Sequence, residues 1–332
     1  MVRAKFGAEA TQRACPSCGE QRGAWLLQVT PRRLSHSTFT VVRCTRCDLV
    51  YTTPLPTSSD LASLYDQQFY GVAPSQPRTF WEPLRHALHL FVLEQRRRAL
   101  LGRPPGIVLD VGCGDGDFLA FLQRHGWKGV GTEYSPDACA LARRKGVRVI
   151  QGELREAALP PDSLDVVTLW HVLEHLPQPL EALQEVHRLL RGDGLLVVEV
   201  PCITSPTFRL CGESWFPLDV PRHLQHFSQQ TLTRLLARAG FTPVRWQHYH
   251  LTDAALACIS FLDKFGGLGR LGGTHYFLPE YRRASAPARL RFLVAAALLA
   301  GASLPYSALA TALSGSGETL TVTARKAASV RG

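Results

Sequence analysis

Residues 108–119 read Val108-Leu109-Asp110-Val111-Gly112-Cys113-Gly114-Asp115-Gly116-Asp117-Phe118-Leu119. A β-branched apolar run leads into three glycines, and a helical pattern begins directly after them. Glycines at such a turn let the backbone approach a ligand closely, and the start of the helix offers free N–H groups. The stretch predicts a strand, a tight ligand-binding turn and a helix; a turn without a ligand is the alternative.

The spacing of these glycines distinguishes two classes of ligand. A dinucleotide-binding turn has the pattern GxGxxG, and its third glycine would fall on Asp117. The pattern here is GxGxG, with Asp110 before it and Asp115 inside it. Carboxylates fit a pyrophosphate poorly, but they fit a ligand that carries a sulfonium and an amine. An NAD-dependent dehydrogenase is therefore disfavoured.

Two later strand ends carry polar residues that suit a nucleoside. Glu133 ends the next predicted strand, 23 residues after Asp110, where a carboxylate can accept hydrogen bonds from both hydroxyls of a ribose. Glu153 and Leu154 follow the third strand, where a polar side chain can reach an adenine amine. The three strand ends together predict a binding crevice for an adenosine-containing ligand.

The region around this turn alternates short β-branched runs with helical patterns, which predicts βαβ units and a parallel sheet. The predicted strands are Ile107–Val111, Gly129–Glu133, Val147–Gln151, Leu164–Trp170, Leu195–Val200 and Pro243–Tyr249. The predicted helices are Phe118–His125, Pro136–Lys145, Pro179–Leu190 and Gln229–Ala239. Gly192 and Gly194 are expected to end the third of these helices and Gly240 the fourth, with Ser228 as the N-cap of the latter.

Four of the nine cysteines form two CxxC turns near the N-terminus, at Cys15, Cys18, Cys44 and Cys47. Each turn can direct two thiolates at one ion, so the two turns complete a tetrahedral S₄ site with no open position for water. The sequence therefore predicts a structural Zn²⁺ in a small ribbon. Asp48 stands where a glycine often relaxes the second turn. Four free thiols in a disordered tail are the alternative.

Composition limits the functional classes. The chain has 332 residues, of which 45% are hydrophobic, and Lys+Arg exceeds Asp+Glu by 37 to 27, a net charge of +10. Nearly all of the positive charge is arginine. An anionic substrate or membrane surface explains it as well as a nucleic acid does, and a nucleic-acid partner is not expected. Without an apolar segment in residues 1–14, we expect a cytoplasmic protein.

With these residues in view, the chain resembles the class I S-adenosylmethionine (SAM)-dependent methyltransferases. The motifs that carry the resemblance are 109–116, Glu133, 165–176, 188–194 and 317–326. The resemblance implies a Rossmann-like, doubly wound α/β sheet of seven strands whose last strand, in 317–326, is antiparallel. It also implies SAM in the crevice at the carboxyl ends of the strands.

The resemblance assigns roles to individual residues of this crevice. Asp110 would lie below the glycine loop, the three glycines would pass the methionine part, Glu133 would hold the ribose, and Glu153 and Leu154 would flank the adenine. The residues implied to bind the cofactor are Asp110, Gly112, Gly114, Gly116, Glu133, Glu153, Leu154 and Trp170. The cysteine pairs are similar to those of a zinc-binding subset that includes sugar C-methyltransferases.

Histidines are the natural proton acceptors near neutral pH, and two pairs follow predicted strands. His171 and His175 follow the fourth strand, and His223 and His226 follow the fifth, where the family builds its substrate wall. His223 is the first candidate for the base and His171 the second; a packing role is the alternative for each. Glu174 with His175 is also compatible with a divalent ion, as similar quinone O-methyltransferases imply.

The acceptor class follows from what stands after the fourth strand. Methyltransferases of nucleic-acid amines commonly have an Asn/Asp-Pro-Pro-aromatic motif there, but residues 169–172 read Leu-Trp-His-Val. Methylation of oxygen or carbon on a small-molecule or lipid-linked acceptor is therefore predicted. The alternatives are an RNA methyltransferase that uses the zinc ribbon and arginine surface, and a non-catalytic SAM-fold binding protein.

Before the last strand lies an apolar stretch, with residues 292–304 uninterrupted by charge and Pro305 directly after them. We expect Pro305 to break the helix, which makes a membrane-spanning helix improbable and a helical hairpin more favourable. That hairpin is predicted to be a lid or dimer face, or a peripheral membrane contact through 289–313 with arginines on lipid headgroups.

These patterns divide the chain into five predicted parts. They are a zinc-ribbon-like module (1–57), a helical linker or cap (58–104), the SAM-binding core (105–250), the apolar helical insertion (251–315), and the last core strand with its tail (316–332).

Overall fold

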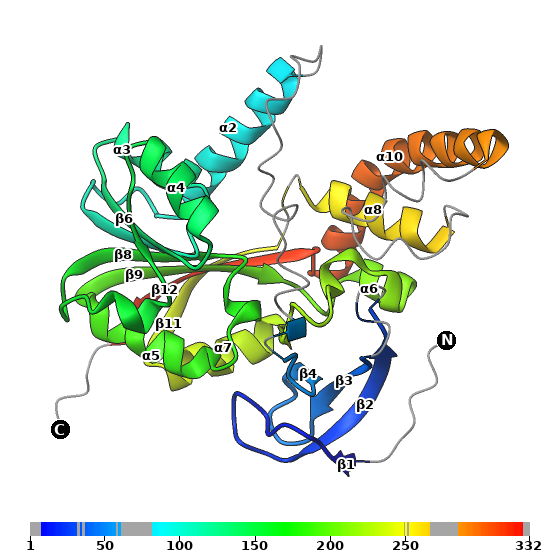
Figure 1. Cartoon of the computed structure of the whole chain (residues 1–332), viewed down its shortest axis with the longest axis horizontal. Coiled ribbons are helices and arrows are strands. Elements are labelled where there is room, and N and C mark those ends of the chain that lie inside the picture. Colours follow the sequence, from blue (N-terminus) through cyan, green and yellow to red (C-terminus); the bar gives the residue numbers. More distant parts are fainter. Residues whose placement is uncertain are drawn as a thin grey trace.

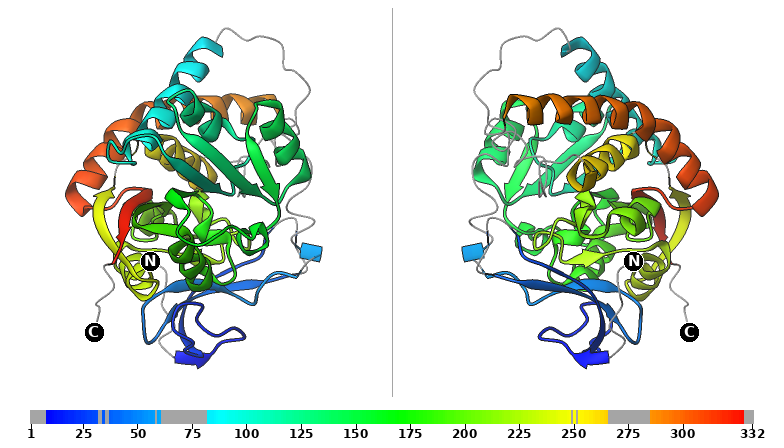
Figure 2. Two further views of the ribbon diagram at one scale, coloured as in Figure 1. Left: turned by 90° about the vertical axis from the view of Figure 1, so that its left-hand side faces the viewer. Right: turned by 90° about the vertical axis from the view of Figure 1, so that its right-hand side faces the viewer.

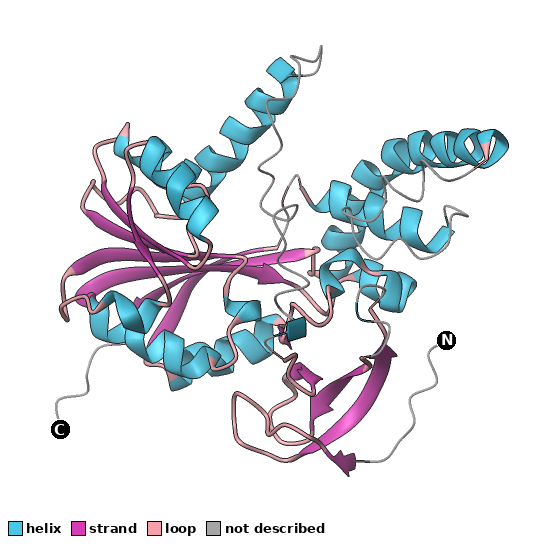
Figure 3. Ribbon diagram, in the orientation of Figure 1, coloured by secondary structure: helices cyan, strands magenta, loops and turns pink. Residues whose placement is uncertain are grey.

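The computed structural model describes residues 8–31, 34, 37–57, 59–60, 82–248, 250, 252–265 and 285–327. They form a seven-stranded sheet with helices on both faces, a smaller sheet near the N-terminus, and a group of helices beside the large sheet (Figures 1 and 3). The predicted fold class is confirmed.

The large sheet has the order β11-β12-β9-β8-β5-β6-β7. Strands β5 to β9 run parallel, whereas β12 pairs antiparallel with both β9 and β11. The chain winds from β5 to one side and returns at β8 to the other, so the order reverses between β5 and β8. The strands are β5 (Ile107–Val111), β6 (Lys128–Glu133), β7 (Arg148–Gln151), β8 (Leu164–Trp170), β9 (Leu190–Pro201), β11 (Phe241–Gln247) and β12 (Thr319–Lys326).

Helices cover both faces of this sheet and bury a separate apolar cluster on each (Figure 1). One face carries α2 (Glu82–Arg98), α3 (Asp117–Gln123) and α4 (Pro136–Arg144). The other carries α5 (Pro179–Leu189) and α7 (Gln229–Arg238). Burial on two faces explains why the parallel strands are continuously apolar rather than alternating.

The predicted boundaries agree within a few residues, with one informative exception. Gly192 and Gly194 do not end a helix: α5 ends at Leu189, and both glycines lie inside β9, which begins at Leu190. The helix passes directly into the strand, with Leu190 as its C-cap. Gly240 does follow α7 with a positive φ of 84°, and Ser228 caps that helix as expected.

The N-terminal sheet has the order β1-β2-β3-β4-β10. Its first four strands are β1 (Ala8–Ala10), β2 (Arg22–Val29), β3 (Phe39–Cys44) and β4 (Val50–Thr53). The fifth strand, β10 (Gln225–His226), comes from the loop that precedes α7 and pairs antiparallel with β4. A strand from the core therefore completes the ribbon sheet.

The remaining helices lie beside the carboxyl end of β9 (Figures 1 and 2). They are α6 (Pro206–Cys211), α8 (Asp253–Phe265) and α10 (Ala286–Ser314), and short 3₁₀ turns occur at η2 (Leu154–Ala157), η3 (Leu173–His175), η4 (Gly212–Ser214) and η5 (Phe216–Leu218). The expected break at Pro305 is wrong, since α10 is a single helix of 29 residues that continues through this proline. The proline ring faces solvent, and only one helical hydrogen bond is lost there.

Candidate functional site

The glycine turn connects β5 to α3 at the point where the strand order reverses, the usual ligand crevice of an open α/β sheet. A Cβ on Gly114 would meet no atom within 4 Å, so this part of the loop faces open space. Gly116 has a different role: it is the N-cap of α3 with φ of 78°, and a Cβ there would lie 2.9 Å from Ala142. Gly112 likewise packs closely, against Val172.

Glu133 lies beside this loop at the end of β6 and is 8% exposed. Its Oε2 accepts from the backbone N–H of Gly114 at 3.0 Å, and its Oε1 accepts from that of Ser135 at 2.8 Å. Two amides therefore hold the carboxylate rigidly while lone pairs remain for further donors. This arrangement and the open space at Gly114 fit a ligand with vicinal hydroxyls.

Asp110 lies beneath the turn rather than in the crevice. It is buried, and its Oδ1 accepts from the Thr168 hydroxyl at 2.6 Å. Burial raises the pKa of Asp110 to about 7, although the hydrogen bond from Thr168 opposes the shift. The predicted position below the loop agrees with this geometry.

The predicted adenine side is formed after β7. Glu153 is exposed and caps η2 in a reciprocal capping box with Glu156, whereas Leu154 is buried. The N–H of Gly152 donates to the carbonyl of Glu133 at 3.0 Å, which ties this turn to the predicted ribose side. The structure thus brings Glu133, Glu153 and Leu154 to one edge of the sheet.

Trp170 ends β8 and is enclosed rather than facing the crevice openly. Its ring packs edge-on against Phe118 at 5.4 Å, and the guanidinium of Arg96 lies 4.8 Å from the ring centre. Within the described residues, the buried indole Nε1 has no hydrogen-bond partner. An unpartnered buried donor at this position fits a ligand acceptor.

His171 directly follows Trp170 and adopts a left-handed φ of 56°. Its Nδ1 lies 3.4 Å from Glu174 Oε1 and its Nε2 lies 3.2 Å from Glu199 Oε1. The side chain is 41% exposed, so only a partial loss of hydration opposes its positive charge, and the two carboxylates outweigh it and raise the pKa of His171 to about 10. The residue is therefore an imidazolium at neutral pH, with no lone pair to accept a proton.

Glu199 is the centre of this cluster, which we call the acceptor-side cluster: Arg96, His171, Glu199, His250 and Thr321. Thr321 donates to Glu199 Oε2 at 2.8 Å, and Arg96 and His250 lie 3.6 Å from its two oxygens. His171 first, and then Arg96, hold the pKa of Glu199 far below its usual range despite burial. An acid inside the apolar strand segment 195–200 was a signal that sequence reasoning missed.

His223 and His226 are buried in the wall beyond β9. His223 Nδ1 donates to the Pro217 carbonyl at 2.8 Å, and its ring lies 4.7 Å from that of His175. Burial and His175 lower the pKa of His223 to about 4, and burial lowers that of His226 to about 3. Both rings are neutral at pH 7 and enclosed by protein.

Glu174 and His175, the predicted pair for a divalent ion, lie together with His223. One ligand atom from each of the three residues lies within 4.8 Å of the others, a spacing that suits a cation. However, Glu174 is fully buried and already forms an ion pair with His171. We therefore treat Glu174 as the ion-pair partner of His171 in the acceptor-side cluster. We assign no metal to the group of Glu174, His175 and His223.

The four N-terminal cysteines converge. Sγ atoms of Cys15 and Cys47, and of Cys18 and Cys44, are 3.5 Å apart, and all four lie within 4.8 Å of one another. The two CxxC turns have the same backbone conformation. The residue after each pair is left-handed, with φ of 76° at Gly19 and 61° at Asp48. Four soft ligands in one cluster fit a tetrahedral Zn²⁺.

The ribbon contacts the histidine wall directly. The Thr52 hydroxyl donates to the carbonyl of His223 at 2.9 Å and lies 3.2 Å from His226 Nε2. Arg234 of α7 donates to the carbonyl of Cys47 at 2.8 Å. The cysteine cluster and the wall of the crevice are thereby mechanically connected.

The central part of the chain is similar in sequence to a known family. Residues 83–245 match the family model described as a methyltransferase domain. The segment begins within α2 and ends within β11, so it includes the glycine turn, Glu133 and the acceptor-side residues up to Glu199.

Curated relatives agree with this match. Probable SAM-dependent methyltransferases of two Mycobacterium tuberculosis strains are 36% identical over 142 residues, 41% of this chain and 49% of theirs. A ubiquinone biosynthesis O-methyltransferase of Actinobacillus pleuropneumoniae is 28% identical over 36% of this chain and 57% of its own. The chain spans about half the length of the mycobacterial relatives. Together these findings support a class I SAM-dependent methyltransferase.

Solved structures extend the likeness to the fold. A [4+2]-cyclase, SpnF, matches with a TM-score of 0.50 and 20% identity over 82% of this chain and 98% of its own. A geranyl diphosphate C-methyltransferase of Streptomyces coelicolor matches with a TM-score of 0.50 and 13% identity over 79% and 88%. One of these two proteins is a cyclase and the other a C-methyltransferase, so the shared architecture alone does not determine the reaction.

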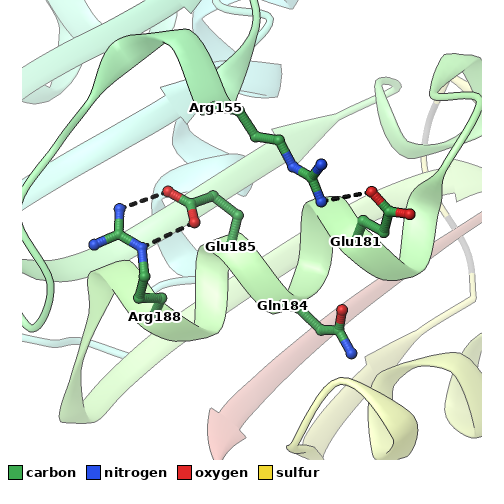
Figure 4. Close-up of a pocket in the computed structure, with 5 residues that line it drawn as sticks. All are labelled: Arg155, Glu181, Gln184, Glu185 and Arg188. Carbon is green, nitrogen blue, oxygen red and sulfur yellow. Dashed lines mark hydrogen bonds and ion pairs between the residues drawn. The ribbon is translucent and has the colours of Figure 1, made fainter.

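A surface hollow of about 390 Å³ lies apart from these residues, on α5 and η2 (Figure 4). Its charged side chains are paired with one another: Arg155 with Glu181 and Arg188 with Glu185, each at 2.6 Å. None of the predicted cofactor or base residues lines it. We assign it no function.

Proposed function

We propose that the protein transfers a methyl group from SAM to oxygen or carbon of a small-molecule or lipid-linked acceptor. The observation that carries the proposal is the Glu133 carboxylate, fixed by two backbone amides beside the open glycine turn at the strand reversal. Relatives named as ubiquinone O-methyltransferases and a demethylmenaquinone methyltransferase support this class of acceptor.

Glu133 would hold the ribose hydroxyls, Gly112 to Gly116 would line the methionine part, and Glu153 and Leu154 would flank the adenine. When bound, SAM supplies an electrophilic methyl group on its sulfonium. Asp110 would act from below by supporting the turn through Thr168. Four cysteines, Cys15, Cys18, Cys44 and Cys47, would hold a structural Zn²⁺.

The acceptor would contact the acceptor-side cluster, because parallel strands β8 and β9 present His171 and Glu199 at the same edge of the sheet. His171 is protonated at neutral pH, so we propose that it acts as a cation rather than as the base. With Arg96 it favours an acceptor atom on which negative charge develops. Phenols, quinols and enols fit this requirement because they ionise readily.

His223, the first candidate for the base, is better suited to a positioning role. Its pKa of about 4 makes it a weak proton acceptor, and its side chain is enclosed by Pro217, His175 and Asp219. Replacing it with alanine should lower thermal stability and acceptor affinity together, whereas loss of turnover alone would restore its role as base.

The cofactor assignment is tested by calorimetry with S-adenosylhomocysteine. Glu133→Ala should weaken binding by about 10- to 100-fold for each hydrogen bond lost. Glu185→Ala, which removes a surface-paired acid on α5, is the matched control and should bind normally. Unchanged affinity in Glu133→Ala would refute the ribose role.

The reaction is tested with wild-type protein, SAM and a panel of phenols, quinols, sugars, amines and RNA, followed by product mass. Methylated phenols or quinols are expected. Tight cofactor binding with no methyl transfer to any acceptor class, including RNA, would favour the non-catalytic alternative.

A further inference from the structure

Helix α10 exposes an apolar face on the protein surface. Its outward residues recur mostly at four-residue intervals, the spacing of one helix face. They are Leu290, Val294, Leu298, Leu304, Leu309 and Leu313, and each is between 48% and 79% exposed. We call these six residues the leucine face.

The inward face of α10 is the more polar one. Ser303 and Ser307 are almost fully buried, and the Ser303 hydroxyl donates back to the Leu299 carbonyl at 2.5 Å. Tyr306 lies 3.3 Å, oxygen to oxygen, from Thr207 and packs against Phe261 of α8 at 5.0 Å. Hydroxyls face the protein and leucines face outward, the reverse of a soluble surface helix.

Charge is distributed as a bilayer boundary requires. Residues 292–317 contain no charged side chain, whereas Arg291 is exposed just before them and Arg289 precedes it. At the end of the neighbouring α8, Lys264 accompanies the exposed ring of Phe265. With a net charge of +10, this pattern complements anionic headgroups around an apolar layer.

The helix meets the length requirement for a membrane, but its packing indicates how it would lie. Val294–Ser314 is long and apolar enough to cross a bilayer, with a mean hydropathy of 1.5. Yet α10 packs along α8, and β12 enters the core sheet five residues after the helix ends. A helix held on one side by its own protein lies in the interface plane rather than across the bilayer.

We propose that α10 is a monotopic membrane anchor that inserts its leucine face into the acyl boundary of an anionic phospholipid bilayer. The proposal is independent of methyl transfer. If the proposed function also holds, a lipid-linked acceptor would approach from this side, because β12 carries Thr321 to Glu199 directly after α10.

The test is flotation of the full chain with vesicles of phosphatidylglycerol and phosphatidylcholine, or of phosphatidylcholine alone. Wild-type protein should float with the anionic vesicles. The double variant L298D/L309D should lose at least about tenfold in partitioning, whereas the matched control L55D/V244D, also at exposed apolar positions, should not. Arg291→Glu should weaken binding to anionic vesicles specifically.

Folding and cofactor binding are monitored separately, by melting temperature and S-adenosylhomocysteine calorimetry, and should be unchanged in L298D/L309D. The proposal is overturned if wild-type protein binds neither vesicle. It is also overturned if the protein is a dimer in lipid-free buffer that L298D/L309D converts to a monomer, because a second copy would then cover the leucine face.

Discussion

The crevice edge has a cofactor half at β5, β6 and β7 and an acceptor half at β8 and β9, and the two halves use different kinds of interaction. At β5, β6 and β7 the site consists of a glycine turn, backbone N–H groups and one fixed acid, Glu133. At β8 and β9 it consists of coupled charges, in which Glu199 faces Arg96, His171 and His250. The first half is set by backbone geometry and the second by a balance of charges.

The two halves differ in how well they tolerate a substitution. Backbone donors stay in place when a side chain is replaced, so a substitution in the cofactor half removes one interaction. In the acceptor-side cluster, removing one charge leaves a buried partner uncompensated, which costs more than the lost contact.

His171→Gln should separate the halves most strongly. Loss of the imidazolium leaves the buried Glu174 without its cationic partner and leaves Glu199 with Arg96, so methyl transfer should fall by about 10²–10³-fold. Calorimetry should show nearly constant affinity for S-adenosylhomocysteine. If cofactor affinity fell equally, the two halves would be a single unit.

Zinc removal should affect the acceptor half first. Chelation, or Cys47→Ser, should unfold the ribbon and loosen the wall through Thr52 and His223, lowering the melting temperature and raising the KM for the acceptor. Elemental analysis should find one zinc per chain in the untreated protein. Cys258→Ser, outside the cluster, is the control and should keep the metal.

The pH dependence of stability should fall in a different pH range for each half. Asp110 has a folded pKa of about 7, above its unfolded value of about 3.9, so its buried charge costs stability as the pH rises from about 4 to 7. Asp110→Asn should remove that loss in melts at successive pH values. An unchanged profile would show that Asp110 is ionised at little cost.

His171 acts in a higher pH range, and its charged form stabilises the fold, whereas the charged form of Asp110 destabilises it. Its folded pKa of about 10 exceeds the unfolded value of about 6.5, so its stabilisation is complete below pH of about 6.5 and is lost as the pH rises through about 10. The stability advantage of wild type over His171→Gln should therefore shrink between pH 6 and 10. A constant advantage would contradict an ion-paired imidazolium.

Two buried threonines give the smallest and best matched comparison. Thr168 supports Asp110 and Thr321 supports Glu199, at 2.6 and 2.8 Å. Thr168→Val removes the hydroxyl that donates to Asp110, and Thr321→Val removes the hydroxyl that donates to Glu199 and also bonds His250 Nε2. Each hydrogen bond lost is worth about 0.5–1.5 kcal/mol. Thr168→Val should weaken S-adenosylhomocysteine binding alone, and Thr321→Val should raise the acceptor KM alone; crossed effects would break the division.

The contrast also explains what the sequence predicts well. The cofactor half lies within residues 110–154, so strand ends and glycine spacing place its residues without knowledge of long-range packing. The CxxC turns are equally local. Both could be predicted because each turn is determined by neighbours in the chain.

The acceptor-side cluster could not be found in this way. Arg96, Glu199, His250 and Thr321 come from four elements far apart in sequence, and only the sheet order brings them together. The pKa of His171 depends on Glu199, so its protonation state could not be predicted either. The break expected at Pro305 was wrong because packing against α8 outweighs one lost hydrogen bond.

The pairing of β10 with β4 has a consequence for synthesis on the ribosome. On the side of β4 that faces away from β3, Val50 and Tyr51 pair with His226 and Gln225, so the ribbon sheet keeps an open edge until most of the chain has emerged. An open edge is a template for pairing with another nascent chain. The N-terminal module is thus made first but completed late, and its maturation waits for the domain that follows it.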